Sequence, residues 1–594
     1  MNKTLLTLSV CTAATLLCAQ DARFQLSPVK KLIKFGWDAP TPSYLLQHFD
    51  EIEKNMIAYD GMGIEFNSST HRKEREKGNY GYPAGSGAMF FSDWKWDHSY
   101  FTREIEQLKE ANAKFKYLKY NFINTNSMAA SKDRFDWFDD KTWDTIVHNF
   151  ALMAAIARET GCRGLNIDIE NYERQTFLFN PVLGRSYAET WDKARQRGRE
   201  FIKAIAKEYP DIVLHTFFWL DQNYACADGV TSPYVKGEKW IMGLTIPFLN
   251  GIYDAMPETV TIVEGMESSG YRATEPGDYQ LVIATRTKKS RWLIDPKNYE
   301  KYWRRTQLGM ATYLDRYIIT DPKSIWFISD DPAGNLKLLQ RNLTCALAAA
   351  DEYAWTWSEG RSWYTWKFSG WMEKACNNIK RPGPLWEDAL PGITQAILYA
   401  KNPQKYYRDI IEKGVFRKNL IRNPKFGDSF AAKNGETLPP EVTFVKAANP
   451  WGCWQDTRTS QGTFSIAADQ GRGGSNAAKM QAVRQGCILQ SPPFSQEGAY
   501  FLRARVRTSG TMVPSLSLGW LDDKGRWNFW GHNMAFPFRK DLGDGWKEAS
   551  ALILKEHFPP PAKGISVQIG VKSEGRPEDV CWVDEVEFYN LNEN

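Results

Sequence analysis

The chain has 594 residues with 75 Lys and Arg against 70 Asp and Glu, which gives a formal net charge of +5. This small surplus, without a long basic run, gives nucleic-acid binding little electrostatic support. The seven His include no HxxxH or HExxH arrangement and the Cys form no CxxC pair, so we expect neither a metal site nor a cofactor.

The first twenty residues have the layout of a secretory signal peptide. One Lys precedes an uncharged apolar run at 5–19, which is too short to span a bilayer as a helix. No later segment is long and apolar enough for a membrane span. We therefore expect cleavage close to Gln20 and a secreted or periplasmic protein. A lipid anchor on Cys18 is the weaker alternative, because bulky Leu17 stands where a lipobox has a small residue.

Short apolar segments alternate with longer amphipathic ones between residues 31 and 366. In the longer segments, apolar residues recur every three or four positions, as in helices. Strands that alternate with helices indicate a parallel sheet, and about eight such units predict a (β/α)8 TIM barrel. A doubly wound sheet is the alternative, but no glycine-rich phosphate loop follows the first strand. The expected strands are 31–38, 59–66, 115–124, 163–172, 212–221, 259–268, either 308–315 or 324–329, and 352–360.

The sequence changes character near Phe416. Beyond it, short segments of alternating apolar residues are separated by turn residues, which predicts an antiparallel β-sandwich of the jelly-roll type. The expected organisation is a signal peptide at 1–20, a catalytic barrel at 21–415 and the sandwich at 416–594.

Three polar side chains alternate with apolar ones along the fourth expected strand. Asn166, Asp168 and Glu170 would project from the same side of that strand. Barrel active sites lie at the carboxyl ends of the strands, where this column of side chains would end. Two ionised carboxylates on one face repel each other, so one pKa should rise, as a general acid requires at neutral pH. We expect Glu170 to be the general acid/base, with Asp168 as its catalytic partner or as the neighbour that raises its pKa.

The segment GLNIDIE resembles the catalytic strand of the family-eighteen chitinases and endo-β-N-acetylglucosaminidases. The matching residues are Gly164, Asn166, Asp168 and Glu170. The resemblance implies a glycoside hydrolase in which Glu170 donates the proton and Asp168 orients an acetamido group of the substrate. That acetamido group would attack the anomeric carbon. Trp355 or Trp357 on the eighth strand would then form the aromatic floor beneath the scissile sugar.

A second pair of acids, Glu264 and Glu267, follows the sixth expected strand. Either could partner Glu170 in a two-carboxylate mechanism, which needs a separation of about 5–5.5 Å for retention or about 6.5–9.5 Å for inversion. We expect Glu267 to be catalytic and Glu264 to bind substrate. The alternative is that these acids cap the helix that follows.

Other polar or aromatic residues near the ends of the expected strands are candidates for substrate binding. Asp38 could equally be a turn acid, because Ala and Pro follow it. The full set of expected substrate contacts is Asp38, Glu65, Asn121, Asn166, Trp219, Glu264, Trp355, Trp357 and Glu359.

The C-terminal region opens with NLIRNPKF and closes with WVDEVEFYNL. Both segments resemble the ends of the carbohydrate-binding sandwiches appended to many secreted glycosidases. A structural jelly roll without a ligand is the alternative. The expected exposed aromatic residues are Trp451, Trp454, Trp520, Trp527 and Trp530.

These patterns together predict a secreted glycoside hydrolase that cleaves a complex oligosaccharide or polysaccharide. The resemblance on the fourth strand implies N-acetylhexosamine linkages. A non-catalytic glycan-binding protein on a barrel scaffold is the first alternative, and a polysaccharide lyase or deacetylase is the second. The sugar, the linkage, endo or exo action and the oligomeric state stay open.

Overall fold

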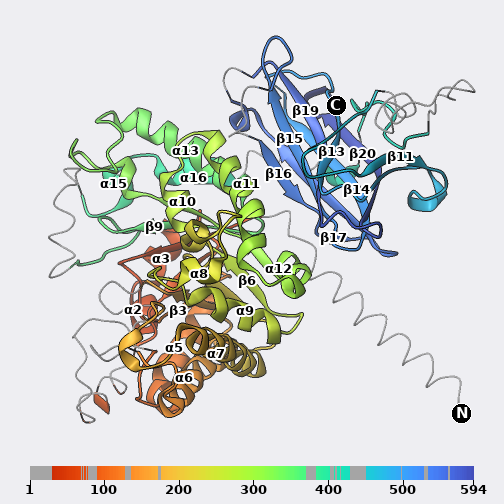
Figure 1. The fold of residues 1–594 in the computed structure, drawn as a ribbon. Helices are drawn as coiled ribbons and strands as arrows, with labels where there is room; N and C mark the ends of the chain where they lie inside the picture. Colours follow the sequence, from red (N-terminus) through yellow and green to blue (C-terminus); the bar gives the residue numbers. More distant parts are fainter. Residues whose placement is uncertain are drawn as a thin grey trace, which may run out of the picture. The chain divides into compact units, whose positions relative to one another are not determined.

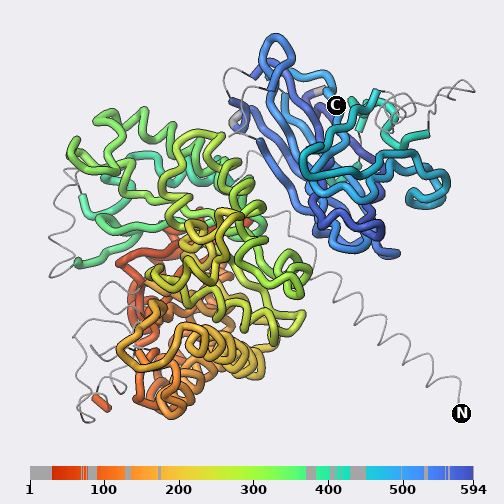
Figure 2. Tube along the Cα trace, viewed as in Figure 1, coloured from red at the N-terminus to blue at the C-terminus, as the bar shows by residue number. Residues whose placement is uncertain are grey.

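In the computed structural model, the chain forms two compact units, whose backbones are traced in Figures 1 and 2. One unit contains Val29–Thr274 and Thr285–Asn402, and the other contains Glu275–Ala284 and Pro403–Asn594. The expected signal peptide lies outside the described residues. These are 30–67, 70, 73–74, 77, 90–127, 135–170, 176–368, 383–401, 407, 411–414, 416–427, 450–496, 498–527, 533–559 and 562–593.

The first unit is built around a parallel sheet in the order β7-β6-β5-β4-β3-β2-β1-β9-β8. Each strand is short and largely buried. The strands are β1 (Lys31–Gly36), β2 (Gly61–Ile64), β3 (Phe122–Asn126), β4 (Gly164–Asp168), β5 (Val213–Thr216), β6 (Thr261–Glu264), β7 (Thr306–Leu308), β8 (Met310–Tyr313) and β9 (Tyr353–Ser358).

The two ends of this sheet are joined through one residue, Gly309. β7 pairs with β6 and β8 pairs with β9, so one stretch of chain closes the sheet into a barrel. The Gly309 amide donates to the Glu264 carbonyl at 2.7 Å. A Cβ at Gly309 would lie 2.9 Å from Val263 Cγ1, so the close approach of β7 and β6 favours glycine here. The prediction of a (β/α)8 barrel followed by a β-sandwich is confirmed.

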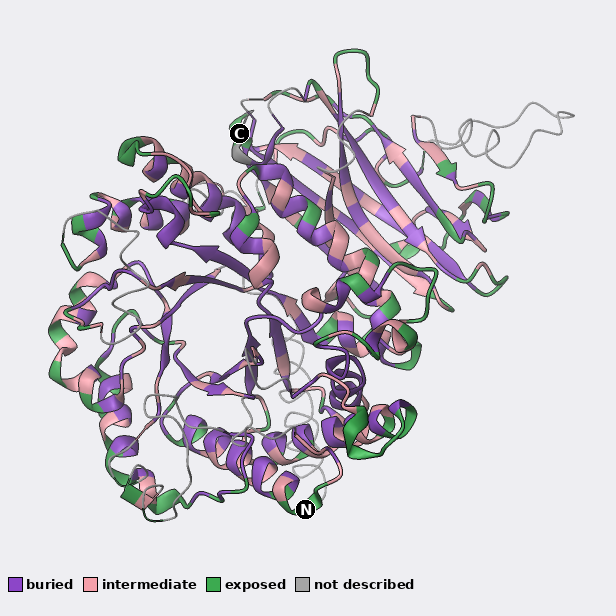
Figure 3. Ribbon diagram, turned by 60° about the vertical axis from the view of Figure 1, so that its left-hand side comes forward, coloured by how far each residue is buried: buried purple, intermediate pink, exposed green. Residues whose placement is uncertain are grey.

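Figure 3 shows the ring of strands surrounded by helices whose buried faces point inward. Among the described residues, none of these helices has the length and apolar character needed to cross a membrane. They are α2 (Pro42–Gln47), α3 (Phe49–Asn55), α5 (Thr102–Lys114), α6 (Asp140–Glu159), α7 (Tyr187–Glu208), α8 (Pro233–Gly237), α9 (Thr245–Ala255), α10 (Glu267–Arg272), α12 (Tyr299–Arg305), α13 (Pro332–Ala349), α15 (Trp386–Ala389) and α16 (Ile393–Lys401). A further helix, α11 (Pro276–Leu293), is divided between the two units after Ala284.

Aromatic side chains fill the barrel interior. The Phe217 ring stacks on Trp355 with a centroid separation of 4.7 Å, and Phe35 meets Phe217 edge-on at 5.2 Å. The His215 ring lies 4.9 Å from Phe35. These rings form a packed plug, as expected for a TIM barrel, so a substrate can reach only the layer above them.

The second unit is an antiparallel sandwich of two sheets. Their strand orders are β10-β13-β19-β15-β16 and β11-β12-β20-β14-β18-β17. The strands are β10 (Gly452–Gln455), β11 (Thr463–Ala467), β12 (Ala477–Gln481), β13 (Gln485–Gln490), β14 (Tyr500–Ser509), β15 (Val513–Leu521), β16 (Met534–Pro537), β17 (Lys540–Asp541), β18 (Trp546–Ile553), β19 (Gly564–Lys572) and β20 (Val580–Asn590).

The tryptophans of the sandwich do not behave alike. Trp451 and Trp520 were expected to be exposed, but they are buried in the core between the sheets. Trp454 is 50% exposed and Trp527 is partly buried, whereas Trp530 lies outside the described residues. Sequence neighbours such as Gly and Asp did not distinguish these environments, because both buried and exposed tryptophans have them.

Candidate active site

The fourth strand ends in the two acids that its sequence pattern singled out. Asp168 is the last residue of β4, and its Oδ1 accepts the backbone N–H of Glu170 at 2.8 Å. Burial raises the pKa of Asp168 to about 7, and the negative charge of Glu170 adds to this rise. Asn166 lies deeper in the barrel, where its Oδ1 is 2.9 Å from His215 Nδ1.

Glu267 begins α10, directly after the turn that follows β6. Its backbone N–H donates to the Phe217 carbonyl at 3.0 Å. The preceding residue, Met266, has a left-handed φ of 54°, a strained conformation for a side chain of this size. Burial raises the pKa of Glu267 to about 8, with further contributions from the charges of Glu170 and Asp168. The turn therefore holds a third acid against the end of β4.

A fourth acid, Glu359, follows β9. It accepts a hydrogen bond from the Tyr313 hydroxyl at 3.0 Å and another from Trp357 Nε1 at 3.0 Å. Burial and the charge of Glu170 raise the pKa of Glu359. Asp315 holds the backbone after β9 in place, because its carboxylate accepts the backbone N–H of Glu359 at 2.8 Å.

We call Asp168, Glu170, Glu267 and Glu359 the acid cluster. The charge of Glu170 raises the pKa of each of the other three, so Glu170 interacts electrostatically with every other member of the cluster. Asp168 ends β4, and the other three residues follow β4, β6 and β9, at the carboxyl ends of the strands where barrel enzymes carry their sites. Asp168 and Glu267, whose pKa values are raised to about 7 and about 8, can exchange protons near neutral pH, which is the requirement for general acid/base chemistry.

Tyrosine and tryptophan side chains line the acid cluster. Tyr271 and Tyr313 stack with a ring separation of 5.2 Å, and the Tyr271 hydroxyl partly offsets the raised pKa of Glu267. Trp357 is only partly buried, unlike the deeper Trp355. Within the described part of the chain, no group of His, Cys, Asp and Glu is arranged to hold a metal ion.

Glu264, expected to bind substrate, instead supports the backbone. It is 1% exposed, and its Oε1 accepts the N–H of Trp219 at 2.7 Å and of Leu220 at 2.9 Å. Trp219 is itself 1% exposed. The structure thus corrects both expectations, because this carboxylate holds the loop after β5 and neither side chain faces an open site.

Three further expected contacts are also corrected by burial. Asp38 is enclosed by an ion pair with Lys34 and by the Ser362 hydroxyl, which donates at 2.6 Å. Trp355 is fully buried and donates to the Gly265 carbonyl at 2.8 Å, below the acid cluster. Asn166 is buried beside His215, as described above. Each of these side chains organises the barrel and presents no surface to a sugar.

Asn121 was misplaced because the third strand begins later than expected. Its side chain accepts the Met62 N–H at 3.0 Å and donates to the Leu118 carbonyl at 3.0 Å. It precedes β3 and therefore lies at the amino end of the barrel, opposite the acid cluster. Residues 115–120 alternate in polarity like a strand but form the connection from α5.

Two other acids follow strands of the barrel, and the charge of one of them, Asp221, interacts with that of Glu267. Glu65 follows β2, and burial raises its pKa to about 7; no ion pair to it is found among the described residues. Asp221 follows β5, and neither of its buried carboxylate oxygens has a hydrogen-bond partner in the described structure. Burial and the charges of Glu264 and Glu267 hold the pKa of Asp221 well above its usual range.

Sequence reasoning missed Tyr271, Tyr313 and Asp315 as site residues. Tyr313 ends β8 and Asp315 follows it, so the search for polar residues at strand ends could have found both. Tyr271 lies four residues after Glu267 on α10, a spacing that places both on one helix face.

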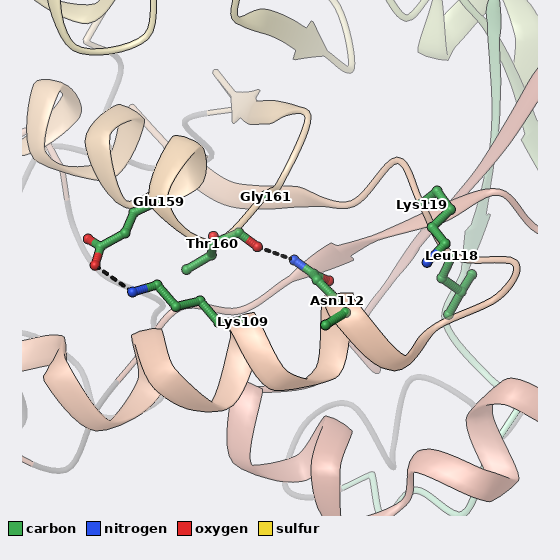
Figure 4. A pocket seen from close by; sticks show the side chains of 8 residues that line it. Lys109, Asn112, Leu118, Lys119, Glu159, Thr160 and Gly161 are labelled. Atoms are coloured by element: carbon green, nitrogen blue, oxygen red, sulfur yellow. Dashed lines mark hydrogen bonds and ion pairs between the residues drawn. The ribbon is translucent and has the colours of Figure 1, made fainter.

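A surface hollow lies between the ends of α5 and α6, at the amino end of the barrel (Figure 4). Lys109 forms an ion pair with Glu159 at 2.8 Å, and Asn112 Nδ2 donates to the Thr160 carbonyl at 2.8 Å. These polar groups already satisfy one another. The hydrogen bond from Lys109 lowers the pKa of Glu159, whereas the acids at the carboxyl end have raised pKa values.

Neither a protein-family model nor a curated protein matches the chain. Solved structures with partial similarity include a family 61 carbohydrate-binding module in complex with β-1,4-galactotriose, with 14% identity over 29% of this chain and 99% of that chain at a TM-score of 0.19. An arabinose-bound family 51 α-L-arabinofuranosidase shows 11% identity over 29% and 26% of the two chains, at a TM-score of 0.21.

A Clostridium thermocellum xylanase fragment with a family 22 binding module and a family 10 enzyme module shows 16% identity over 24% and 26% of the two chains, at a TM-score of 0.19. The match spans about a quarter of each enzyme chain. The structural neighbours thus include glycoside hydrolases and carbohydrate-binding modules. These partial similarities, at TM-scores of 0.19 to 0.21, do not assign an activity to this chain.

Proposed function

We propose that the protein is an exported glycoside hydrolase in which Glu170 and Glu267 carry the acid/base chemistry. The proposal is supported by the place of Glu267 at the start of α10, after β6, where burial and the charge of Glu170 raise the pKa of its carboxyl to about 8. Export is inferred from the N-terminal signal-like sequence.

The charge pattern supports a division of roles between the two glutamates. A carboxyl with a pKa of about 8 keeps its proton at neutral pH, so Glu267 is suited to protonate the glycosidic oxygen. Glu170 then acts as the carboxylate, either attacking the anomeric carbon or activating water, according to the separation of the two groups. The sequence alone favoured Glu170 as the proton donor, whereas the electrostatics favour Glu267.

The remaining groups around the acid cluster fit a sugar. The partly exposed Trp357 ring offers an apolar face for stacking, and Glu359, fixed by Tyr313, offers an acceptor for a hydroxyl. The resemblance of the β4 segment makes N-acetylhexosaminides the first substrates to assay. In that version, Asp168 orients the acetamido group.

Glu170→Gln and Glu267→Gln are the primary tests, assayed by reducing-end release from N-acetylhexosaminides and neutral polysaccharides. General acid/base groups contribute about 10²–10⁴-fold to rate, so we expect a loss of that size in kcat for each variant. Glu159→Gln, at the paired hollow of Figure 4, is the matched control and should retain activity. Unchanged turnover in Glu170→Gln would refute the proposal. Glycan binding without product release by the wild type would instead favour a capture protein.

A further inference from the structure

Within the acid cluster, Glu359 is held on both of its carboxylate oxygens. Trp357 Nε1 donates to Oε1 at 3.0 Å, and the Tyr313 hydroxyl donates to Oε2 at 3.0 Å. The backbone is held as well, because the Asp315 carboxylate accepts the N–H of Glu359 at 2.8 Å and that of Gly360 at 2.6 Å. The protein's own groups therefore fix the position and the orientation of this carboxylate.

The pairing of β8 with β9 explains this arrangement. Tyr313 and Trp357 are register partners in the parallel pair, so their side chains lie at the same level of the barrel. Glu359 comes two residues after Trp357, a spacing that keeps both on one side of an extended chain. The Tyr313 ring stacks on Tyr271 at 5.2 Å and meets Trp326 edge-on at 5.3 Å. These ring contacts hold the Tyr313 hydroxyl beside Glu359.

Opposing influences act on the ionisation of Glu359. Burial and the charge of Glu170 raise its pKa, whereas the hydrogen bonds from Trp357 and Tyr313 lower it. Hydrogen bonds donated to a carboxylate favour its charged form. The two donors therefore support a negative charge at a place where burial and a like charge oppose it. The other titratable groups that interact with Glu359 are Glu267, Tyr271 and Asp315.

A fixed negative charge has a use in the cleavage of a glycosidic bond. Positive charge develops on the sugar ring in an oxocarbenium-like transition state. A carboxylate held beside that ring stabilises the transition state more than the ground state, and it needs no reorganisation during the reaction.

We propose that Glu359 is a further catalytic residue that supplies this charge, and that Tyr313 and Trp357 are positioning residues that hold its carboxylate. This role goes beyond accepting a sugar hydroxyl, and it rests on the proposed hydrolase function. Glu359 forms no bond to the sugar and transfers no proton. The roles of Glu267 as the acid and of Glu170 as the reacting carboxylate are therefore unchanged.

The Tyr313→Phe variant is the first test, because it removes one donor and keeps the ring. Loss of a hydrogen bond to the charged form raises the pKa of Glu359, so the charge is lost at a higher pH than in the wild type. We expect the acidic limb of the kcat profile to move to higher pH by about one unit. Trp357→Phe removes the other donor and should move the limb in the same direction. An acidic limb at the wild-type position in both variants would overturn the positioning roles.

Tyr317→Phe is the matched control for loss of a buried hydroxyl. The Tyr317 hydroxyl accepts a hydrogen bond from Asn342 Nδ2 at 3.0 Å and makes no hydrogen bond to Glu359. This variant should lower Tm as much as Tyr313→Phe does, or more, and leave the acidic limb in place. An equal shift of the limb in Tyr317→Phe would assign the shift to lost stability and overturn the role of Tyr313.

Glu359→Gln keeps the size of the side chain and removes its charge. We expect kcat to fall by about 10²–10³-fold while KM changes by less than about threefold, because the charge acts on the transition state. A rise in KM with unchanged kcat would make Glu359 a binding group only and overturn its catalytic role.

The same assays separate this inference from the proposed function. Wild-type protein that hydrolyses no glycan would overturn the proposed function itself. Active wild type together with an equally active Glu359→Gln variant would overturn only the role of Glu359.

Discussion

Asp and Glu side chains lie at both ends of the barrel, but their surroundings differ. At the amino end, Glu352 pairs with Lys31 and accepts from Gln307 Nε2 at 2.9 Å, while Asp60 pairs with Lys401 at 2.7 Å. At the carboxyl end, no Lys or Arg of the described residues forms an ion pair with Asp168 or Glu267. The partner of a buried acid, more than the acid itself, therefore separates a stabilising role from a chemical one.

This contrast has an energetic side. Acids paired with cations keep their charge and support folding, whereas buried acids near one another are least unfavourable when they hold protons. The acids at the carboxyl end therefore lower the stability of the fold but can carry protons, as expected at active sites.

The largest expected effect is a difference in kcat between substitutions of an acid at the carboxyl end and of an acid at the amino end of the barrel. Glu267→Gln should lower kcat by about 10²–10⁴-fold, because it removes the proton donor. Glu352→Gln, at the amino end, should leave kcat within about twofold of the wild type. Steady-state kinetics on the best substrate test both variants, and a similar loss in each would erase the contrast.

The next effect concerns pH. Because the proton on Glu267 is needed and its pKa is about 8, kcat/KM should fall as pH rises through about 8. In Glu267→Gln, the residual activity should lose this basic limb. A limb of unchanged position in the variant would assign it to another group.

The Glu267→Gln substitution should lower activity but raise stability at high pH. The folded state binds the proton of Glu267 more tightly than the unfolded chain does, so this contribution is present at low pH and is lost as pH rises through about 8. Glu267→Gln cannot ionise and should have a higher Tm than the wild type at pH 9, with the difference shrinking toward pH 5. Thermal scans across this range would contradict the account if the variant were less stable at pH 9.

The smallest effect is expected at the amino end. Glu352→Gln removes one partner of the Lys31 ion pair and weakens the hydrogen bond from Gln307. A loss near 1 kcal/mol should lower Tm by about 1–2 °C, without a change in the pH profile of activity. An unchanged Tm at neutral pH would show that pairing at this end contributes nothing measurable.

Much of the barrel could be predicted from local patterns. Strand and helix periods differ, so alternation alone predicts six of the expected strands. Of the two alternatives for the seventh, the segment at 308–315 is the one that contains a strand, β8. The third strand was placed too early, because residues 115–120 imitate strand alternation. Asp168 is the last residue of β4, whereas Glu170 lies two residues beyond the strand, so their placement on one strand face stays a prediction.

Depth within the barrel could not be predicted in the same way. Trp355 and Trp357 share one face of β9, but only the packing of Phe217 against Trp355 shows that Trp355 belongs to the plug. Likewise, Glu264 and Glu267 differ by three residues, and the turn at Met266 sends one toward backbone amides and the other toward Glu170. Such differences arise from tertiary contacts that no local pattern encodes.

In the proposed mechanism, Glu267 holds its proton at neutral pH partly because Glu170 carries a negative charge. Titration of the Glu267 side-chain carboxyl by ¹³C NMR, in the wild type and in Glu170→Gln, tests this dependence. We expect a pKa of about 8 in the wild type and a clearly lower pKa in Glu170→Gln, because a neighbouring charge is removed. A Glu267 carboxyl that titrates in the ordinary range, or whose pKa does not respond to Glu170→Gln, would contradict it.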